Sequence, residues 1–386
     1  MTAPDNSHSD WVPLLAPDMP STADLIPWLD RIQQAGQYTN FGPLTQLLEQ
    51  KIAQQFCVET AQVTTVANAT QGLELVLQAL NLPAGARILL PAFTFVATAT
   101  AVVRAGHQPV LADVDAQTWM LTPEIARTAC SSMHIDAVLP VATFGMPHDM
   151  LKWQCFEQDT GLAVVIDAAA GYGSQWLQGA PGTLVFSLHT TKSLPAGEGG
   201  VVVSTRPGLA AKVRQLSNFG INLDPAASLS IGVLAALGSN AKMSEYHAAI
   251  GLASLNKWAR NAEQRSELEK LLMSELQQAC GDRLVWQAQG TGGALIAPTL
   301  LCARLPSAAD RSALEQICRQ ERIMTRRWYQ PLLQHMDVLQ RRCLLLDTPN
   351  AQALSQTLLG LPFFREMTFM QRLRLRNAVA QWTGYQ

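Results

Sequence analysis

Lys192 is the residue whose surroundings in the sequence best suit covalent chemistry. It ends the run FSLHTTK (residues 186–192), which lies between two strand-like segments and is followed by Gly197, Gly199 and Gly200. A lysine amine that is partly removed from water can form a Schiff base with an aldehyde. Taken alone, the same lysine could be a solvated surface group, as most lysines are. His189, in the same run, is more simply interpreted as structural than as catalytic.

Asp167 is the second candidate, because of its place at the end of an apolar run. It follows AVVI (163–166) and precedes three alanines. A carboxylate at the end of a buried strand could pair with a protonated heterocyclic nitrogen. The alternative is a carboxylate that caps the start of a helix.

Thr70 lies where a predicted strand gives way to a predicted helix, in the run NATQG (68–72). The first turn of a helix has free N–H groups and a positive dipole end, which suit a phosphate. The alternative is an ordinary capping threonine, since such caps are common.

Two further residues have a functional and a structural interpretation. Phe95, in the run PAFTF (91–95), could belong to the core or could offer a flat face to an aromatic cofactor. Asn240, in GSNAKMSE (238–245), could be a turn residue ahead of a helix capped by Ser244. Together, the lysine, the carboxylate, the aromatic ring and the phosphate cup are the parts that an enzyme using pyridoxal 5′-phosphate (PLP) needs.

The segments that must position these residues alternate between strand and helix. Strands are predicted at 63–67, 86–91, 109–114, 137–142, 163–167, 183–188 and 199–204, and helices at 72–80, 95–106, about 122–130 and 148–160. This alternation predicts an α/β fold with a mostly parallel, doubly wound sheet. Ligands bind at the edge of such a sheet where its strands end, and the candidate residues fall there.

After about residue 260 the pattern changes. A helical run at 261–279 leads to a strand-like run at 294–305 and then to helical runs at 308–320 and 367–382. We therefore predict a large PLP-binding domain over residues 1–260 and a smaller C-terminal α+β domain over residues 261–386. The first 20 residues, rich in proline, serine and aspartate, are predicted to form an extended arm that belongs to the large domain.

Composition excludes several classes of function. The 386 residues are 48% hydrophobic and 15% charged with a formal net charge of -2, which favours a large core and argues against a nucleic-acid surface. The seven cysteines form no CxxC pair, so neither a metal site nor a disulfide framework is expected. Neither a secretory signal nor a membrane-spanning run is recognisable. We expect a soluble, cytoplasmic protein that binds neither membranes nor nucleic acids.

From about residue 38 to about residue 380 the sequence resembles the DegT/DnrJ/StrS-type family of PLP-dependent sugar aminotransferases, which have PLP fold type I. The segments that carry the resemblance include VANATQGLELVLQAL, PAFTFVATATAVVRAGHQPVLADVDAQTW, VIDAAAGYGS, VFSLHTTKSLPAGEGGVVVS and GSNAKMSEYHAAIGLASL. The resemblance implies that Lys192 is the catalytic lysine that holds PLP as a Schiff base. It also implies that Asp167 pairs with the pyridine nitrogen and that Phe95 stacks on the ring.

The phosphate-binding positions follow from the same resemblance. Ala69, Thr70 and Ser187 match the family's phosphate-binding residues, and Asn240 matches a residue that reaches the cofactor phosphate of the neighbouring subunit in a homodimer. The sequence also departs from the family, which usually has glycine at the position of Ala69, histidine or glutamine at that of Ala170, and asparagine at that of Ser193.

The resemblance implies transfer of an amino group from an amino acid, L-glutamate, to a keto-deoxysugar linked to a nucleoside diphosphate. The branch is closest to enzymes acting on dTDP-linked keto-6-deoxyhexoses. One alternative is an acceptor such as a cyclitol or another small ketone. A non-catalytic PLP-binding protein would lack the lysine, and the family's sugar dehydratases have histidine in its place, so Lys192 argues against both.

Overall fold

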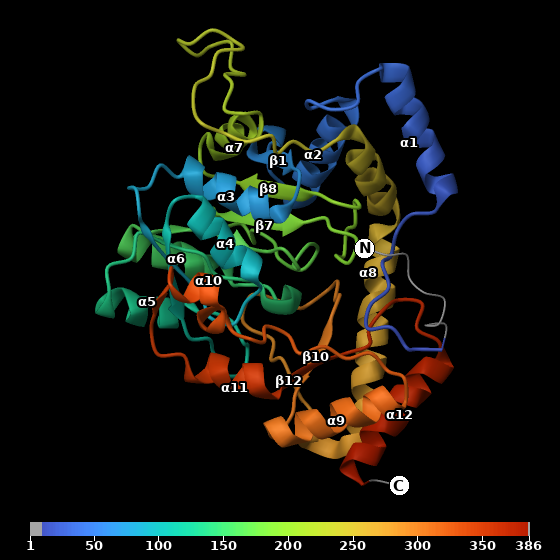
Figure 1. The fold of residues 1–386 in the computed structure, drawn as a ribbon. Coiled ribbons are helices and arrows are strands. Elements are labelled where there is room, and N and C mark those ends of the chain that lie inside the picture. The colour runs from blue at the N-terminus through green and yellow to red at the C-terminus, as the bar shows by residue number, and fades with distance from the viewer. Residues whose placement is uncertain (1–9, 385–386) are drawn as a thin grey trace.

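One twisted sheet forms the centre of the computed structural model, which describes residues 10–384 (Figure 1). One part of the sheet has the order β1-β8-β7-β6, from Val63–Val66, Gly200–Ser204, Thr183–Ser187 and Ile166–Asp167. The other has the order β11-β3-β2-β4-β5, from Leu344–Leu345, Gln108–Ala112, Arg87–Pro91, Ala137–Val138 and Ala163–Val164.

The two parts join through the segment 163–167, where β5 runs directly into β6. The N–H of Val165 donates to Val138 O at 3.0 Å and that of Asp167 to Pro140 O at 2.8 Å, so the ladder continues between the two parts. Among the described residues, every strand pair of this central sheet is parallel except those of β8, which runs antiparallel to both β1 and β7. The α/β class and the mostly parallel sheet are therefore as predicted.

Alternating side chains along the strands bury both faces of the sheet. In β7, Leu184 and Phe186 point into one apolar cluster and Val185 into the opposite one. The first cluster is covered by α2 (Pro43–Phe56), α5 (Pro123–Ser132), α6 (Met150–Thr160) and the first part of α8 (Glu245–Cys280). The second is covered by α3 (Ala69–Ala79), α4 (Val96–Arg104), α7 (Leu209–Ser217), α10 (Asp337–Gln340) and α11 (Pro349–Thr357).

A third apolar cluster forms the core of the C-terminal region. Here β9 (Val285–Trp286), β10 (Leu301–Arg304) and β12 (Leu358–Leu361) make an antiparallel sheet in the order β12-β10-β9. It packs with α9 (Ala308–Gln320), α12 (Phe369–Thr383) and the second half of α8. Single turns of 3₁₀ helix lie at Thr60–Gln62, Thr143–Gly145, Gly281–Arg283 and Leu333–His335. Within residues 10–384, no helix combines the length and apolar character that crossing a bilayer requires.

Helix α8 links the two regions, and Figure 1 shows it running along one side of the molecule from one region to the other. It passes residue 260 without a break, and α1 (Thr22–Ala35) packs against it. Two short segments pack in the region opposite to the one that the sequence predicts for them. Strand β11, from the predicted C-terminal domain, joins the large sheet beside β3, and Val12, from the predicted large domain, is buried in the C-terminal cluster. The division at residues 260 and 261 stays a prediction, and the first nine residues of the predicted arm lie outside the described residues.

The predicted strand at 294–305 is wrong over its first part, because β10 begins only at Leu301. Pro298 has no N–H for a strand ladder. The N–H groups of Ile296 and Ala297 donate to the hydroxyl of Ser174, at 2.9 and 3.2 Å, in the large region. This stretch therefore connects the two regions as irregular chain.

Candidate active site

A cavity of about 760 Å³ opens at the edge of the sheet where the parallel strands end. Six of the seven residues singled out in the sequence line it: Ala69, Thr70, Phe95, Asp167, Ser187 and Lys192. Asp167 and Ser187 are the last residues of β6 and β7. Ala69 and Thr70 begin α3, which follows β1, and Phe95 and Lys192 lie in the segments that follow β2 and β7. The ends of parallel strands meet at one edge of a sheet. Asn240 is exposed and does not line this cavity.

Asp167 lies at the floor of the cavity, with a relative exposure of 4%. One carboxylate oxygen accepts a hydrogen bond from the Thr98 hydroxyl at 2.8 Å, and the other accepts from the N–H of Ala169 at 3.1 Å. Burial raises the pKa of Asp167, while these two donors and the charge of Lys192 oppose the rise. The donors therefore favour the charged form, as pairing with a protonated nitrogen would require.

Lys192 is partly buried in the turn that follows β7. The backbone N–H of Lys192 donates to His189 O at 2.9 Å. The backbone N–H of Thr190 donates to Gly197 O at 3.0 Å, and this bond closes the loop back toward β8. Burial lowers the pKa of Lys192, and the charge of Asp167 opposes this shift. A lysine with a lowered pKa has more of the neutral amine that attacks a carbonyl carbon.

The first turn of α3 forms one wall of the cavity. The cap is Asn68, not Thr70: its side-chain oxygen accepts from the N–H of Gln71 at 2.9 Å. Among the described residues, nothing accepts a hydrogen bond from the N–H of Ala69 or Thr70. Two free N–H groups at the positive end of a helix suit a phosphate group.

Close packing of β8 brings this turn into place. At Gly200, a Cβ atom would lie 2.7 Å from the backbone nitrogen of Ala69, so only glycine allows the approach. Ser187, at the end of β7, accepts a hydrogen bond from the N–H of His189 at 3.3 Å and keeps its hydroxyl proton to donate. The arrangement can therefore bind a phosphate without a cationic side chain.

Phe95 precedes α4, and its ring is not part of the core. The residue is 51% exposed and lines the cavity, which leaves its ring free to cover a flat cofactor. His189 also lines the cavity, and its Nδ1 lies 3.0 Å from the Thr191 hydroxyl. Asn240 accepts a hydrogen bond from Lys242 Nζ at 2.7 Å, and its predicted reach into a neighbouring subunit remains a prediction.

Several residues of the cavity wall were not foreseen from the sequence. Thr98 lies one helical turn after Phe95, so its place beside Asp167 could have been suspected from the spacing. The C-terminal region contributes Arg326, Trp328 and Tyr329, and the N-terminal arm contributes Leu15. Only the unusual run TRRWYQP (325–331), rich in cationic and aromatic residues, could have pointed to the first three.

Arg326 brings a positive charge from the C-terminal region to the cavity wall. Its guanidinium lies over the Trp328 ring, 4.3 Å from the ring centre, and its backbone pairs with Gly360 in both directions, at 3.1 and 2.8 Å. Tyr329 stacks on Phe144 with ring centres 5.4 Å apart. Within residues 10–384, no group of three or more His, Cys, Asp or Glu side chains is suited to a metal ion. The site thus combines an amine, a buried carboxylate, an anion-binding helix end and a guanidinium.

Comparison with known proteins gives the family. A model described as the DegT/DnrJ/EryC1/StrS aminotransferase family matches residues 21–379. The dTDP-4-amino-4,6-dideoxy-D-glucose transaminase of Shigella dysenteriae is 28% identical over 357 residues, which are 91% of this chain and 94% of that protein. Relatives from Mycobacterium tuberculosis are 33% identical over 263 residues, and the match spans 62% of their length.

Solved structures of other proteins have the same fold as this chain. A protein from Bacillus cereus ATCC 10987, provisionally assigned as a PLP-dependent aminotransferase, superposes with a TM-score of 0.86 at 26% identity, covering 96% of this chain and all of that one. DesI, solved in the presence of its TDP-sugar product, superposes with a TM-score of 0.84 at 26% identity, covering 97% and 95%. The α/β fold predicted from the sequence is confirmed. The chain belongs to the DegT/DnrJ/EryC1/StrS aminotransferase family.

Proposed function

We propose that the chain is a PLP-dependent aminotransferase that moves an amino group from L-glutamate to a keto-deoxysugar linked to a nucleoside diphosphate. The observation that carries the proposal is the meeting of Lys192, Asp167 and the free N–H groups of α3 in one cavity. These groups match the three polar parts of PLP: its aldehyde, its ring nitrogen and its phosphate.

Each residue has a defined task in this proposal. PLP, when bound, supplies a ring that takes up the electrons released at the donor's α-carbon. Lys192 Nζ would hold the cofactor at its aldehyde carbon and would act as the base that moves the α-proton of the donor. Asp167 keeps a proton on the ring nitrogen, and Thr98 keeps Asp167 charged and aimed. Phe95 covers the ring and excludes water from that face.

Two observations support the choice of substrates. The relative from Shigella dysenteriae is named as a transaminase of a dTDP-linked aminosugar, and DesI was solved with a TDP-sugar product. Arg326 offers a guanidinium to an anionic group, either a carboxylate of the amino donor or the diphosphate of the acceptor. A cyclitol or another small ketone is the alternative acceptor.

Two separate half-reactions test this function. The protein loaded with PLP should convert L-glutamate to 2-oxoglutarate once per site and pass to the pyridoxamine form, which absorbs at a shorter wavelength. Adding a dTDP-linked 4-keto- or 3-keto-6-deoxyhexose should restore the original spectrum and yield an aminosugar. Recovery with a cyclitol ketone but no nucleotide sugar would favour the alternative acceptor, and failure of the first half-reaction with every amino acid would refute the proposal.

We further propose that the active form is a homodimer in which each site takes Lys192 from one chain and Asn240 from the other. Two inactive variants, Lys192→Ala and Asn240→Asp, should complement each other when refolded together. In a hybrid dimer one site carries both defects and the other carries neither. With free exchange half of the dimers are hybrids, so activity should return to roughly a quarter of the wild-type value. If both residues served one site within a chain, mixing would restore nothing.

A further inference from the structure

Residues 10–20, which we call the arm, contact the C-terminal region and reach the cavity. Val12 pairs with the chain beside Ile323 through two backbone hydrogen bonds of 2.8 and 3.0 Å. The carbonyl of Leu14 accepts from the N–H of Phe363 at 2.9 Å, and Leu15 lines the cavity. The arm is thus bound to the C-terminal region and also lines the candidate active site.

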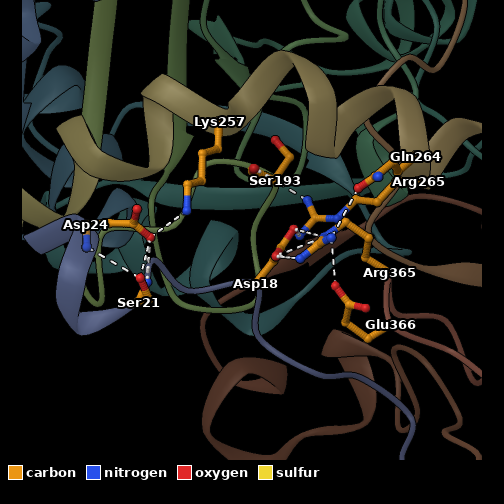
Figure 2. A network of polar contacts seen from close by, with 9 residues as sticks. All are labelled: Asp18, Ser21, Asp24, Ser193, Lys257, Gln264, Arg265, Arg365 and Glu366. Carbon is orange, nitrogen blue, oxygen red and sulfur yellow. Dashed lines mark hydrogen bonds and ion pairs between the residues drawn. The ribbon is translucent and has the colours of Figure 1, made fainter.

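Asp18 connects the arm to two arginines from different parts of the fold (Figure 2). Arg365, after β12, holds the Asp18 carboxylate with both Nε and Nη2, at 2.9 to 3.1 Å. Arg265, on α8, lies 3.2 Å from the same carboxylate. The side chains of Asp18 and Arg265 are only 9% and 7% exposed. A buried guanidinium needs a counter-charge, and among the described residues Asp18 is the carboxylate paired with Arg265.

Arg265 also reaches the residue that follows Lys192. Its Nη1 donates to the carbonyl of Ser193 at 3.4 Å, and the Ser193 hydroxyl donates to Tyr172 O at 2.6 Å. A second contact from α8 lies two residues on, where the Ser254 hydroxyl donates to Pro195 O at 2.6 Å. The segment that carries Lys192 is therefore anchored on α8, and one of its anchors is a guanidinium that depends on Asp18.

We propose that Asp18 is a positioning residue for Lys192. Its carboxylate holds the Arg265 guanidinium against the Ser193 carbonyl, and this contact fixes the segment that presents Lys192 to the cavity. Arg365 completes the link, since it ties the same carboxylate to the C-terminal region. The Asp18 carboxylate therefore connects the arm both to the C-terminal region, through Arg365, and to the segment that carries Lys192, through Arg265.

The test compares Asp18→Asn with Asp24→Asn, which breaks a different contact between the N-terminal part of the chain and α8. Asp24 pairs with Lys257 at 2.6 Å, and in Figure 2 no dashed contact joins this pair to Ser193. Hydrogen–deuterium exchange on the protein without cofactor should be faster in residues 188–196 of the Asp18→Asn protein, on the order of tenfold. The same residues of the Asp24→Asn protein should exchange as in the wild type.

Arg265→Met separates placement of the lysine from docking of the arm. It removes the donor to Ser193 and leaves Asp18 paired with Arg365, so it creates no unpaired buried charge. We expect faster hydrogen–deuterium exchange in residues 188–196 and unchanged exchange in the arm. Adding Asp18→Asn to this variant should cause no further increase at 188–196, because the two residues act as one unit. If Asp18→Asn alone fails to fold, the exchange of the Arg265→Met protein at residues 188–196 can still overturn the proposal.

The kinetic part of the test rests on the proposed function, whereas the exchange part does not. In the enzyme loaded with PLP, Asp18→Asn should lower kcat on the order of tenfold with little change in KM, as expected for a displaced reacting group. Unchanged exchange at 188–196 in Asp18→Asn or in Arg265→Met would overturn the proposal, as would equal effects of Asp18→Asn and Asp24→Asn. Failure of the wild type to transfer amino groups would leave the exchange comparison intact and refute only the proposed function.

Discussion

Replacing Lys192 with alanine should lower amino transfer by at least about a thousandfold, since the change removes both the covalent attachment and the base. The side chain shares the cavity with Asp167, and within residues 10–384 no other lysine lines it. PLP should still bind weakly through the first turn of α3, Ser187 and Phe95. The measurement is the turnover of glutamate with the keto sugar, together with the absorbance of the bound cofactor.

The matched control for this variant is Lys270→Ala, which changes an exposed lysine of α8 outside the cavity. Turnover and cofactor absorbance should stay at wild-type values there. Residual turnover above about a tenth of the wild type in the Lys192→Ala protein would contradict the role given to Lys192, provided that the protein is shown to be folded.

Replacing Asp167 with asparagine should preserve PLP binding and lower kcat by about a hundredfold or more. The amide has nearly the same shape as the carboxylate and can still accept from Thr98, but it carries no charge to hold a proton on the ring nitrogen. Without that proton the ring is a poor acceptor for the electrons of the α-carbon. Rates of the glutamate half-reaction, measured in a single turnover, report this step directly.

Asp159→Asn is the matched control for Asp167→Asn, because Asp159 pairs with Arg127 on the exposed surface between α5 and α6. Its kcat should not change. A near-normal kcat in the Asp167→Asn protein would show that the ring nitrogen needs no charged partner here, and the assignment of Asp167 would then fail.

The sequence could predict those parts of the site that depend on local pattern. Asp167 ends β6 and Lys192 follows β7, the apolar residues of these strands are read directly from the sequence, and parallel strands bring their ends together. The strand predicted at 183–188 is found at Thr183–Ser187, and the helix predicted at 308–320 is found with the same bounds. The alternative interpretation of Thr70 as a helix cap is wrong, because Asn68, two residues earlier, caps α3 with its own side chain.

Contacts between segments far apart in the chain could not be predicted in this way. Arg326 reaches the cavity only because β12 seats its backbone against Gly360, and no local pattern reveals that pairing. Asp18 and Arg365 are separated by 347 positions, and their contact depends on how the arm crosses the C-terminal region. The first part of the strand predicted at 294–305 is wrong for a related reason, since the N–H groups of Ile296 and Ala297 donate to Ser174 in the other region.

Covalent trapping of the cofactor tests the central claim most directly. The protein is loaded with PLP, reduced with borohydride, digested and mapped by mass spectrometry. We predict a single reduced adduct, on the peptide that contains Lys192, and its loss when the protein is first converted with glutamate. An adduct on any other lysine, or no adduct in a protein saturated with PLP, would contradict the account.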